Sequence, residues 1–252
     1  GVDPAGPVGR RLCEGCARLA PCAGMTEADG ETLDRLIDGA TNRESYFFRD
    51  RNQLRLVIAL LAERGPGTAP ATLWSAGCAS GEEAYSLAAL ASENGGLPGF
   101  AVLGTDLSPA ALAVAERGVY RTGAMSSCRA LTAADERHLP AEEGGTARRV
   151  SPAVRARVRF ARHNILAGPP PGAPFDAVLC RNVLIYMDQE GRRRCLATLG
   201  AALKPGGVLA IGPADAAPPT DPASLGYRTV CRGNAIAFIK DAAAREVPHA
   251  VR

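Results

Sequence analysis

The chain lacks the features that would indicate a membrane protein or a nucleic-acid-binding protein. No stretch reaches the roughly 18–20 consecutive apolar residues of a membrane span, and no charged-then-apolar leader opens the sequence. Only Lys204 and Lys240 are lysines among the 29 basic residues, and the formal net charge of +3 is too small to indicate a nucleic-acid partner. We therefore expect a cytoplasmic protein with no direct membrane insertion.

Metal and disulfide chemistry have little support in the sequence. The eight cysteines are expected to be free thiols in a cytoplasmic protein. Cys13 and Cys16 have the spacing of zinc ligands, and Cys22 follows closely. A structural zinc site needs four ligands, however, and no nearby histidine or second C-x-x-C pair completes this one. We expect no metal site.

Length and composition are typical of one globular α/β domain with a small appendage, because 46% of the 252 residues are hydrophobic and 22% are charged. Residues 1–28 are rich in Gly, Pro, Cys and Ala, and 29–40 have the pattern of a short helix. We expect 1–40 to form a partly disordered arm and helix, and 241–252 to form a C-terminal tail. Because the chain begins with Gly1 rather than Met, we expect a trimmed N-terminus.

The most informative segment is a loop of small residues between an apolar run and a helix start. Residues 73–76 have the pattern of a buried strand, and the glycine-containing loop 77–81 follows, as in α/β sheets that receive a nucleoside cofactor. Ser80 and Glu83 have the S-x-x-E spacing of a capping box, which predicts that a helix begins there. The P-loop lysine is missing, and Glu82 and Glu83 would repel a pyrophosphate. S-adenosylmethionine, which has no phosphate, is therefore the better candidate.

A carboxylate follows the next apolar run. Residues 100–106 have the pattern of a second strand, and an acidic side chain at its end, Asp106, can accept hydrogen bonds from both ribose hydroxyls of a nucleoside. Asp106 is not needed as a helix cap, because Ser108 and Pro109 already provide the N-cap and the first residue of a helix over 109–117. We therefore favour the ribose-binding role.

Further segments complete an alternation of strands and helices. The apolar spacing predicts a helix over 50–64 and another over 189–203, with the run Arg192-Arg193-Arg194 on the solvated face of the second. The remaining expected strands are 158–161, 175–180 and 207–212, followed by a hairpin of 227–231 and 235–240. This alternation indicates a mostly parallel sheet that is closed by an antiparallel hairpin.

Five motifs follow one another along roughly residues 41–240. They are Ser45-Tyr46-Phe47-Phe48-Arg49-Asp50, Trp74-Ser75-Ala76-Gly77-Cys78-Ala79-Ser80-Gly81-Glu82-Glu83, Gly104-Thr105-Asp106-Leu107-Ser108, Gly118-Val119-Tyr120 and Cys180-Arg181-Asn182-Val183-Leu184-Ile185-Tyr186. Together they resemble the chemotaxis receptor methyltransferase (CheR) family of S-adenosyl-L-methionine-dependent protein-glutamate O-methyltransferases. The resemblance implies a class I methyltransferase fold, which is Rossmann-like with a mostly parallel seven-stranded sheet, and a chemoreceptor-like protein as the acceptor.

The resemblance also assigns the reacting end of the site to Arg49, Arg181 and Tyr186. The guanidinium of Arg49 can orient a carboxylate through two contacts, and that carboxylate belongs either to the substrate glutamate or to the methionine end of the cofactor. Arg181 and Tyr186 would face the methyl group, with the tyrosine hydroxyl fixing the geometry of the donor. No general base is expected, because a glutamate is already ionised at neutral pH.

The cofactor-binding residues implied by the resemblance lie on the same motifs and after the strand 158–161. They are Ser45, Arg49, Ala76, Glu82, Asp106, Asn164, Ile165, Arg181 and Asn182. Ala76 and Glu82 would line the glycine loop. Asn164 and Ile165 would flank the adenine.

Two parts of the chain depart from the family pattern or leave it open. The family carries a fuller helical domain before the Phe-Phe-Arg motif, and here that domain is shortened or absent. In the family, the segment matching 121–157 holds a small β-subdomain that binds a tethering peptide of the receptor. Here 143–150 is expected to form a turn and a strand of it, with a plain surface loop as the alternative.

The sequence therefore defines the function less closely than the fold. The leading hypothesis is methylation of glutamate side chains on a protein acceptor. A small-molecule methyltransferase of the same fold and a non-catalytic adaptor that binds S-adenosylmethionine are the alternatives. The sequence gives no indication of the oligomeric state.

Overall fold

The computed structural model describes residues 34, 38–39, 44–65, 69–93, 96–215 and 226–241. The expectations for Cys13, Cys16 and Cys22 lie outside the described residues. The same holds for most of the arm 1–40 and the tail 241–252. Within the described ranges, no helix is both long enough and apolar enough to cross a bilayer.

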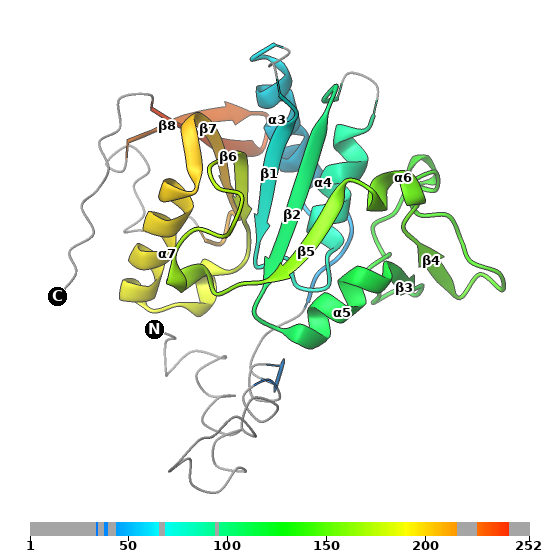
Figure 1. Ribbon diagram of the computed structural model, residues 1–252. Coiled ribbons are helices and arrows are strands. Elements are labelled where there is room, and N and C mark those ends of the chain that lie inside the picture. Colours follow the sequence, from blue (N-terminus) through cyan, green and yellow to red (C-terminus); the bar gives the residue numbers. More distant parts are fainter. Residues whose placement is uncertain are drawn as a thin grey trace, which may run out of the picture.

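A seven-stranded sheet forms the centre of the molecule, with the strand order β5-β2-β1-β6-β7-β9-β8 (Figure 1). The strands are β1 (Ala71–Ala76), β2 (Phe100–Asp106), β5 (Val158–Arg162), β6 (Phe175–Cys180), β7 (Leu203–Ile211), β8 (Tyr227–Arg232) and β9 (Ala235–Lys240). The first five in this order pair in parallel, whereas β9 pairs antiparallel with both β7 and β8. The predicted class I methyltransferase fold and its closing hairpin are confirmed.

Helices cover both faces of the sheet, so the domain has three layers. The helices are α3 (Arg51–Ala62), α4 (Glu82–Ala91), α5 (Pro109–Arg117), α6 (Pro152–Arg155) and α7 (Gln189–Ala201). One core cluster joins α3 and α4 to side chains such as Leu73 and Leu179, and a second joins α7 to Trp74 and Val178. Neighbouring residues of β1 and β6 thus point into opposite cores, which is why these central strands are apolar throughout.

The end of β2 and the start of α5 form as the sequence predicts. The Ser108 side chain accepts a hydrogen bond from the backbone N–H of Ala111 at 3.0 Å, and Pro109 takes the first helical position. Gly118 ends the helix in the left-handed conformation with φ 63°. The cap of this helix is therefore Ser108 and not the Asp106 carboxylate.

The predicted capping box at α4 is wrong. The N-cap is Gly81, whose φ of 93° turns the chain sharply into the helix, and no side chain caps it. Ser80 donates instead to the Glu82 carboxylate at 2.8 Å, and Glu83 accepts from Ser75 at 2.7 Å. A Cβ at position 81 would lie 2.8 Å from the Cβ of Ala115. Only glycine therefore allows this turn and this close packing of α4 on α5.

A small two-stranded sheet joins the segment 121–157 to the residues just before it, because β3 (Val119–Arg121) pairs antiparallel with β4 (Ala147–Arg149). The strand predicted within 143–150 is confirmed. Asp135, which is fully buried, ties this insert to α3, because Arg51 donates to both of its oxygens at 2.8 and 2.6 Å. Burial alone would raise the pKa of Asp135, but the hydrogen bonds from Arg51 and Thr132 outweigh it and hold the pKa below its usual value.

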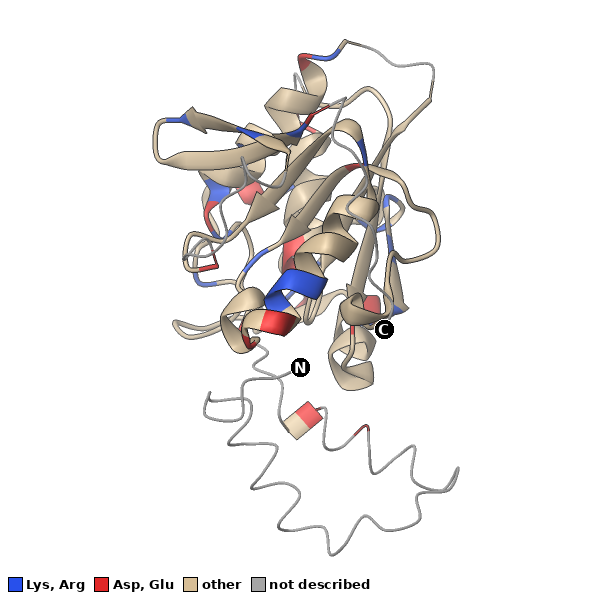
Figure 2. Ribbon diagram, turned by 90° about the vertical axis from the view of Figure 1, so that its left-hand side faces the viewer, with Lys and Arg blue, Asp and Glu red and all other residues tan. Residues whose placement is uncertain are grey.

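The start of α7 carries a charged band on the outside of the molecule (Figure 2). Arg193 and Arg194 are exposed, as predicted, and Arg193 pairs with Glu190 at 2.7 Å. Arg192 differs from the prediction, because it is half-buried and its Nε donates to the carbonyls of Leu184 and Met187. It thereby fixes the turn that follows β6.

Candidate active site

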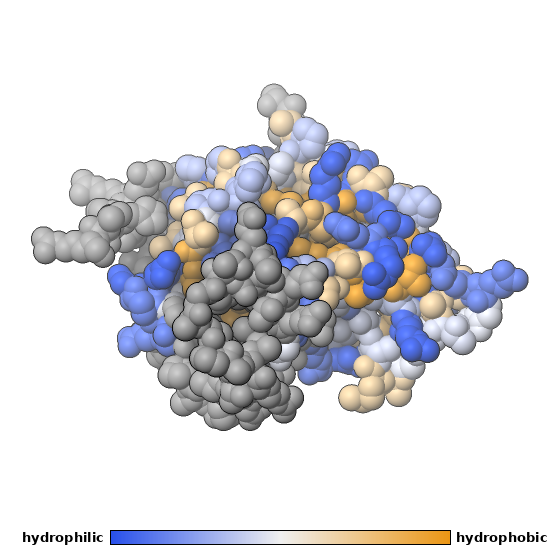
Figure 3. Space-filling model, turned by 60° about the horizontal axis from the view of Figure 1, so that its bottom comes forward, coloured by the Kyte–Doolittle hydropathy of each residue, from blue (hydrophilic) through white to orange (hydrophobic). Residues whose placement is uncertain are grey.

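A pocket of about 260 Å³ opens at the edge of the sheet where the parallel strands end. On the visible part of the face that comes forward in Figure 3, hydrophobic residues lie among hydrophilic ones. The loops after β1, β2, β5 and β6 line the pocket, together with the segment that leads into α3. The predicted site residues that line this pocket are Ser45, Arg49, Asp106, Ile165, Arg181, Asn182 and Tyr186. Ala76, Glu82 and Asn164 do not.

The glycine loop folds tightly over the ends of β1 and β2. The backbone N–H groups of Gly77 and Cys78 both donate to the Thr105 carbonyl, at 2.8 and 2.9 Å. Gly77 has a φ of 73°, and a Cβ there would lie 2.6 Å from a methyl group of Val183. The loop therefore brings backbone, rather than side chains, to the wall of the pocket. This is the property expected of a loop that packs against a cofactor.

Asp106 is oriented by two backbone groups. Its Oδ2 accepts from the N–H of Ala79 at 2.8 Å, and its Oδ1 accepts from the N–H of Ser108 at 2.9 Å. Ala79 has a φ of 48°, a conformation that side chains resist, so this contact is held by the surrounding fold. An ionised carboxylate has about four acceptor positions. A carboxylate at this place, at the end of β2, can bind the two hydroxyls of a ribose.

The wall next to Asp106 suits a flat apolar ring. Ile165 lines the pocket beside Leu107 and His163, and the fully buried Trp74 lies behind it in the same core. Asn164 is exposed, and its side-chain oxygen caps the following turn by accepting from the N–H of Leu166 at 3.0 Å. Asn164 thus positions Ile165 rather than lining the pocket.

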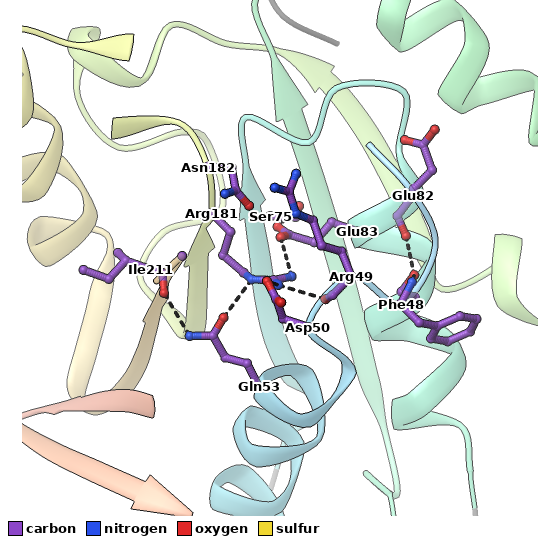
Figure 4. Close-up of polar contacts among 12 residues, drawn as sticks. Phe48, Arg49, Asp50, Gln53, Ser75, Glu82, Glu83, Arg181, Asn182 and Ile211 are labelled. Atoms are coloured by element: carbon purple, nitrogen blue, oxygen red, sulfur yellow. Dashed lines mark hydrogen bonds and ion pairs between the residues drawn. The ribbon is translucent and has the colours of Figure 1, made fainter. Parts of the chain in front are cut away.

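Glu82 and Glu83 point to opposite sides of the α4 start (Figure 4). Glu82 is 1% exposed and turns away from the pocket, where its carboxylate also accepts from Ser127 of the insert at 2.6 Å. Glu83 lines the pocket in its place. Ala76 is buried within β1. The sequence analysis placed Glu82 at the cofactor loop, whereas the structure places Glu82 against the insert and Glu83 at the pocket.

Arg181 is the centre of a buried polar network (Figure 4). Its side chain is 2% exposed, and its donors reach four partners. These are Gln53 Oε1 at 2.8 Å, Glu83 Oε2 at 3.1 Å, the Arg49 carbonyl at 2.8 Å and Asp50 Oδ2 at 2.7 Å. Arg181 lines the pocket, and the hydrogen bonds of its guanidinium within the described residues are all to protein groups.

Gln53 extends this network to the strands β7 and β9. Its amide donates to the carbonyls of Ile211 and Ile236, both at 2.8 Å, while its oxygen accepts from Arg181. The residue is 5% exposed and was missed in the sequence. The available signal was a polar side chain on the helix face that otherwise carries apolar residues such as Val57.

Arg49 has a different environment from Arg181. It lines the pocket, and its guanidinium carbon lies 5.5 Å from the centre of the Tyr46 ring. Its side chain runs towards Asn182 (Figure 4). Within the described part of the chain, its guanidinium makes no hydrogen bond or ion pair. The flanking residues Phe48 and Asp50 both have positive φ, at 58° and 48°, so the turn holds Arg49 in a strained backbone.

A buried carboxylate holds the loop after β6. Asp215, which is fully buried, accepts from the backbone N–H groups of Asn182, of Ile185 at 3.1 Å and of Gly212 at 3.2 Å. Burial raises the pKa of Asp215, and the backbone hydrogen bonds oppose that rise. Asn182 itself has a φ of 59°. Asp215 therefore orients the segment that carries Asn182 and Tyr186. The sequence analysis did not include Asp215, although an acidic residue shortly after a parallel strand indicates a site residue.

Metal chemistry finds no support in the described residues, where no group of three or more His, Cys, Asp or Glu side chains could hold an ion. The five cysteines that the structure describes are free thiols, and Cys78 is the one that lines the pocket. Burial raises the pKa of the Cys78 thiol well above its usual value, and the neighbouring carboxylates Asp106, Glu83 and Glu82 add to the rise. Cys78 is therefore an uncharged wall residue and not a nucleophile.

The family model described as the CheR methyltransferase, SAM binding domain, matches residues 43–226. The chain belongs to the CheR family. A chemotaxis protein methyltransferase from Listeria monocytogenes is 35% identical over 206 residues, covering 80% of this chain and 75% of that protein. Chemotaxis protein methyltransferase 1 from Pseudomonas aeruginosa is 35% identical over 196 residues, covering 74% and 71%. Among solved structures, a TehB-like SAM-dependent methyltransferase from Corynebacterium glutamicum aligns with 85% of this chain and 97% of that chain, at a TM-score of 0.41 and 16% identity.

Membership of the CheR family makes this chain an S-adenosylmethionine-dependent protein-glutamate O-methyltransferase, and the predicted cofactor is confirmed. The residues of the pocket fit that cofactor. Asp106 offers acceptors for a ribose, and Ile165 and Leu107 offer apolar contact for a base. The loop 77–81, which lacks the lysine of a phosphate-binding loop, lets a cofactor approach its backbone closely.

Asp106→Ala should weaken binding of S-adenosylhomocysteine by about 1.5–3 kcal/mol, because each lost hydrogen bond has a charged acceptor. Isothermal titration calorimetry measures this directly. Asp176→Ala is the matched control, since Asp176 also accepts a backbone N–H, that of Thr72 at 2.8 Å, but does so at the opposite end of the sheet. Equal affinities of folded Asp106→Ala and wild type would remove Asp106 from the cofactor site.

Proposed function

We propose that the methyl acceptor of this enzyme is a glutamate side chain of a chemoreceptor-like signalling protein. Residues 41–240 would act as one cytoplasmic methyltransferase domain, with 121–157 as its insert. The relatives named as chemotaxis protein methyltransferases, from Listeria monocytogenes and Pseudomonas aeruginosa, support this acceptor class.

The observation that carries the proposal is the different environment of two arginines, Arg181 and Arg49. Arg181 neutralises Asp50 and Glu83, the acidic groups that would otherwise repel an incoming carboxylate. Arg49 projects its guanidinium into the same pocket and is left to bind a ligand. A planar guanidinium can hold a carboxylate through two parallel hydrogen bonds and so fix its direction.

S-adenosylmethionine supplies a methyl group on a positively charged sulfur. The chain has to bind a carboxylate close to that methyl group, exclude water and hold the line of attack. Such positioning can contribute up to about 7–11 kcal/mol to lowering the barrier. No residue has to remove a proton, because glutamate, with an ordinary pKa of about 4.3, arrives ionised.

The roles of the other residues follow from their positions around the pocket. We assign Asp106 to the ribose, Ile165 to the adenine, and Ser45 and Asn182 to the methionine end of the cofactor. Tyr186 orients the reacting groups. Arg181, Gln53 and Asp215 bind other protein groups around the pocket, and we assign them as positioning residues.

The product bond tests this function. Label transferred from methyl-labelled S-adenosylmethionine to a chemoreceptor cytoplasmic domain should stay on the protein at neutral pH and become volatile as methanol in mild alkali. An ester hydrolyses there, whereas a methylated amine survives. Alkali-stable label on the protein would exclude a glutamate acceptor. Label on a small molecule alone would favour the small-molecule enzyme, and tight cofactor binding with no transfer to any acceptor would favour the adaptor.

Arg49→Lys should keep the charge but lose the planar fork, so turnover should fall much more than folding stability. We expect a loss of about tenfold or more in kcat, the effect of one hydrogen bond to a charged group, with an unchanged melting temperature. Arg232→Lys is the control, because Arg232 makes a two-contact ion pair with Glu63, which lies just past the end of α3 away from the pocket. If both variants turn over like wild type, Arg49 does not orient the acceptor.

A further inference from the structure

The loop that opens the insert is fixed against the acceptor side of the pocket. The backbone N–H of Phe47 donates to the Ser127 carbonyl at 2.9 Å, and the Ser127 hydroxyl donates to the buried Glu82 at 2.6 Å. These contacts lock the insert to both the Phe-Phe-Arg turn and the start of α4. Side chains next to Ser127 are therefore held at a defined place beside the segment that carries Arg49.

One of these side chains is a second arginine over the same aromatic ring. The guanidinium carbon of Arg129 lies 4.1 Å from the centre of the Tyr46 ring, and that of Arg49 lies 5.5 Å from it. Tyr46 lines the pocket. Stacking on a ring holds a guanidinium in place while leaving its N–H edge to bind other groups. Tyr46, which lines the pocket, thus has two guanidinium groups near its ring, one from the motif turn and one from the insert.

We propose that Arg129 is a second carboxylate-binding subsite, which selects acceptor segments that carry another acidic side chain within one helical turn of the methylated glutamate. The inference rests on the proposed function, because it concerns the same acceptor. Arg49 holds the glutamate that is methylated, and Arg129 holds its acidic neighbour. The insert therefore takes part in choosing which glutamates react.

The spacing of the two arginines fits this acceptor. Both guanidinium carbons lie near one ring, so their separation cannot exceed the sum of 5.5 and 4.1 Å. Side chains three or four residues apart on a helix have Cβ atoms about 5–6 Å from each other. Two carboxylates on successive turns of an acceptor helix can therefore reach the two cations together.

The present partner of Arg129 is exchangeable. Its Nη2 donates to Glu44 at 3.0 Å, and its Nη1 reaches the Ser126 carbonyl at 3.3 Å. The Glu44 side chain is 65% exposed, and ion pairs that are open to water contribute little to stability. Glu44 lines the pocket mouth and stands where an acceptor carboxylate would arrive. An incoming acidic side chain can replace it without leaving a buried charge unpaired.

The test compares enzyme variants on matched acceptors. The acceptor is a chemoreceptor cytoplasmic domain that the wild-type enzyme labels, with and without glutamine at the acidic position one turn from the labelled glutamate. The enzyme variants are Arg129→Ala, Arg129→Lys and the control Arg137→Ala. Arg137 belongs to the same insert and pairs with Glu93 at 3.0 Å, beyond the end of α4 that lies away from the pocket. The readouts are kcat/KM for each acceptor and the affinity for S-adenosylhomocysteine.

Wild type and Arg137→Ala should prefer the acidic neighbour by about tenfold in kcat/KM, the effect of one charge-assisted hydrogen bond. Arg129→Ala should lose this preference while binding S-adenosylhomocysteine normally, and Arg129→Lys should keep part of it. An Arg129→Ala enzyme that still discriminates, or a wild type that labels both acceptors equally, would overturn the subsite but leave the proposed function intact. A wild type that forms no alkali-labile label on any acceptor would overturn both.

Discussion

The buried guanidinium of Arg181 is the interaction on which the rest of the site depends. A charge that is 98% removed from water is tolerated only when it is paired and fully hydrogen-bonded. Its partners come from the Phe-Phe-Arg turn with the adjoining start of α3, and from α4. One side chain after β6 therefore fixes two separate segments. Through the Arg49 carbonyl it also sets the direction in which Arg49 enters the pocket.

The backbone around the pocket is strained in a way that this network explains. The non-glycine residues with positive φ in the described chain are Phe48, Asp50, Ala79 and Asn182, and all four adjoin the pocket. Each such conformation costs of order 1–3 kcal/mol and persists only where surrounding contacts over-determine it. Arg181 holds Asp50, Asp106 holds Ala79 and Asp215 holds Asn182. Phe48 is held by Ser86, whose hydroxyl oxygen accepts from its backbone N–H at 2.8 Å. Three buried or half-buried charged side chains thus maintain the geometry that a cofactor and an acceptor require.

Much of the fold was accessible from the sequence, because apolar periodicity and caps act locally. The strands, the hairpin and the Ser108 cap of α5 belong to this class. The choice between Glu82 and Glu83 was not accessible, since it depends on the left-handed turn at Gly81 and on Ser127, 45 residues away. Arg49 and Arg181 have the same side chain, so the sequence alone does not show which of the two binds protein groups. Only tertiary pairing with Gln53 and Glu83, 128 and 98 residues from Arg181, distinguishes the guanidinium of Arg181, which binds protein groups, from that of Arg49.

The central claim is that Arg181 organises the site while Arg49 meets the ligand. A crystal structure of the chain with S-adenosylhomocysteine and glutarate, as a mimic of the acceptor carboxylate, tests it most directly. The account predicts that Arg181 keeps its contacts with Gln53, Asp50 and Glu83, and that the Arg49 guanidinium binds a carboxylate of glutarate or of the homocysteine end. An Arg181 guanidinium turned to a ligand carboxylate, with Asp50 and Glu83 released, would contradict it.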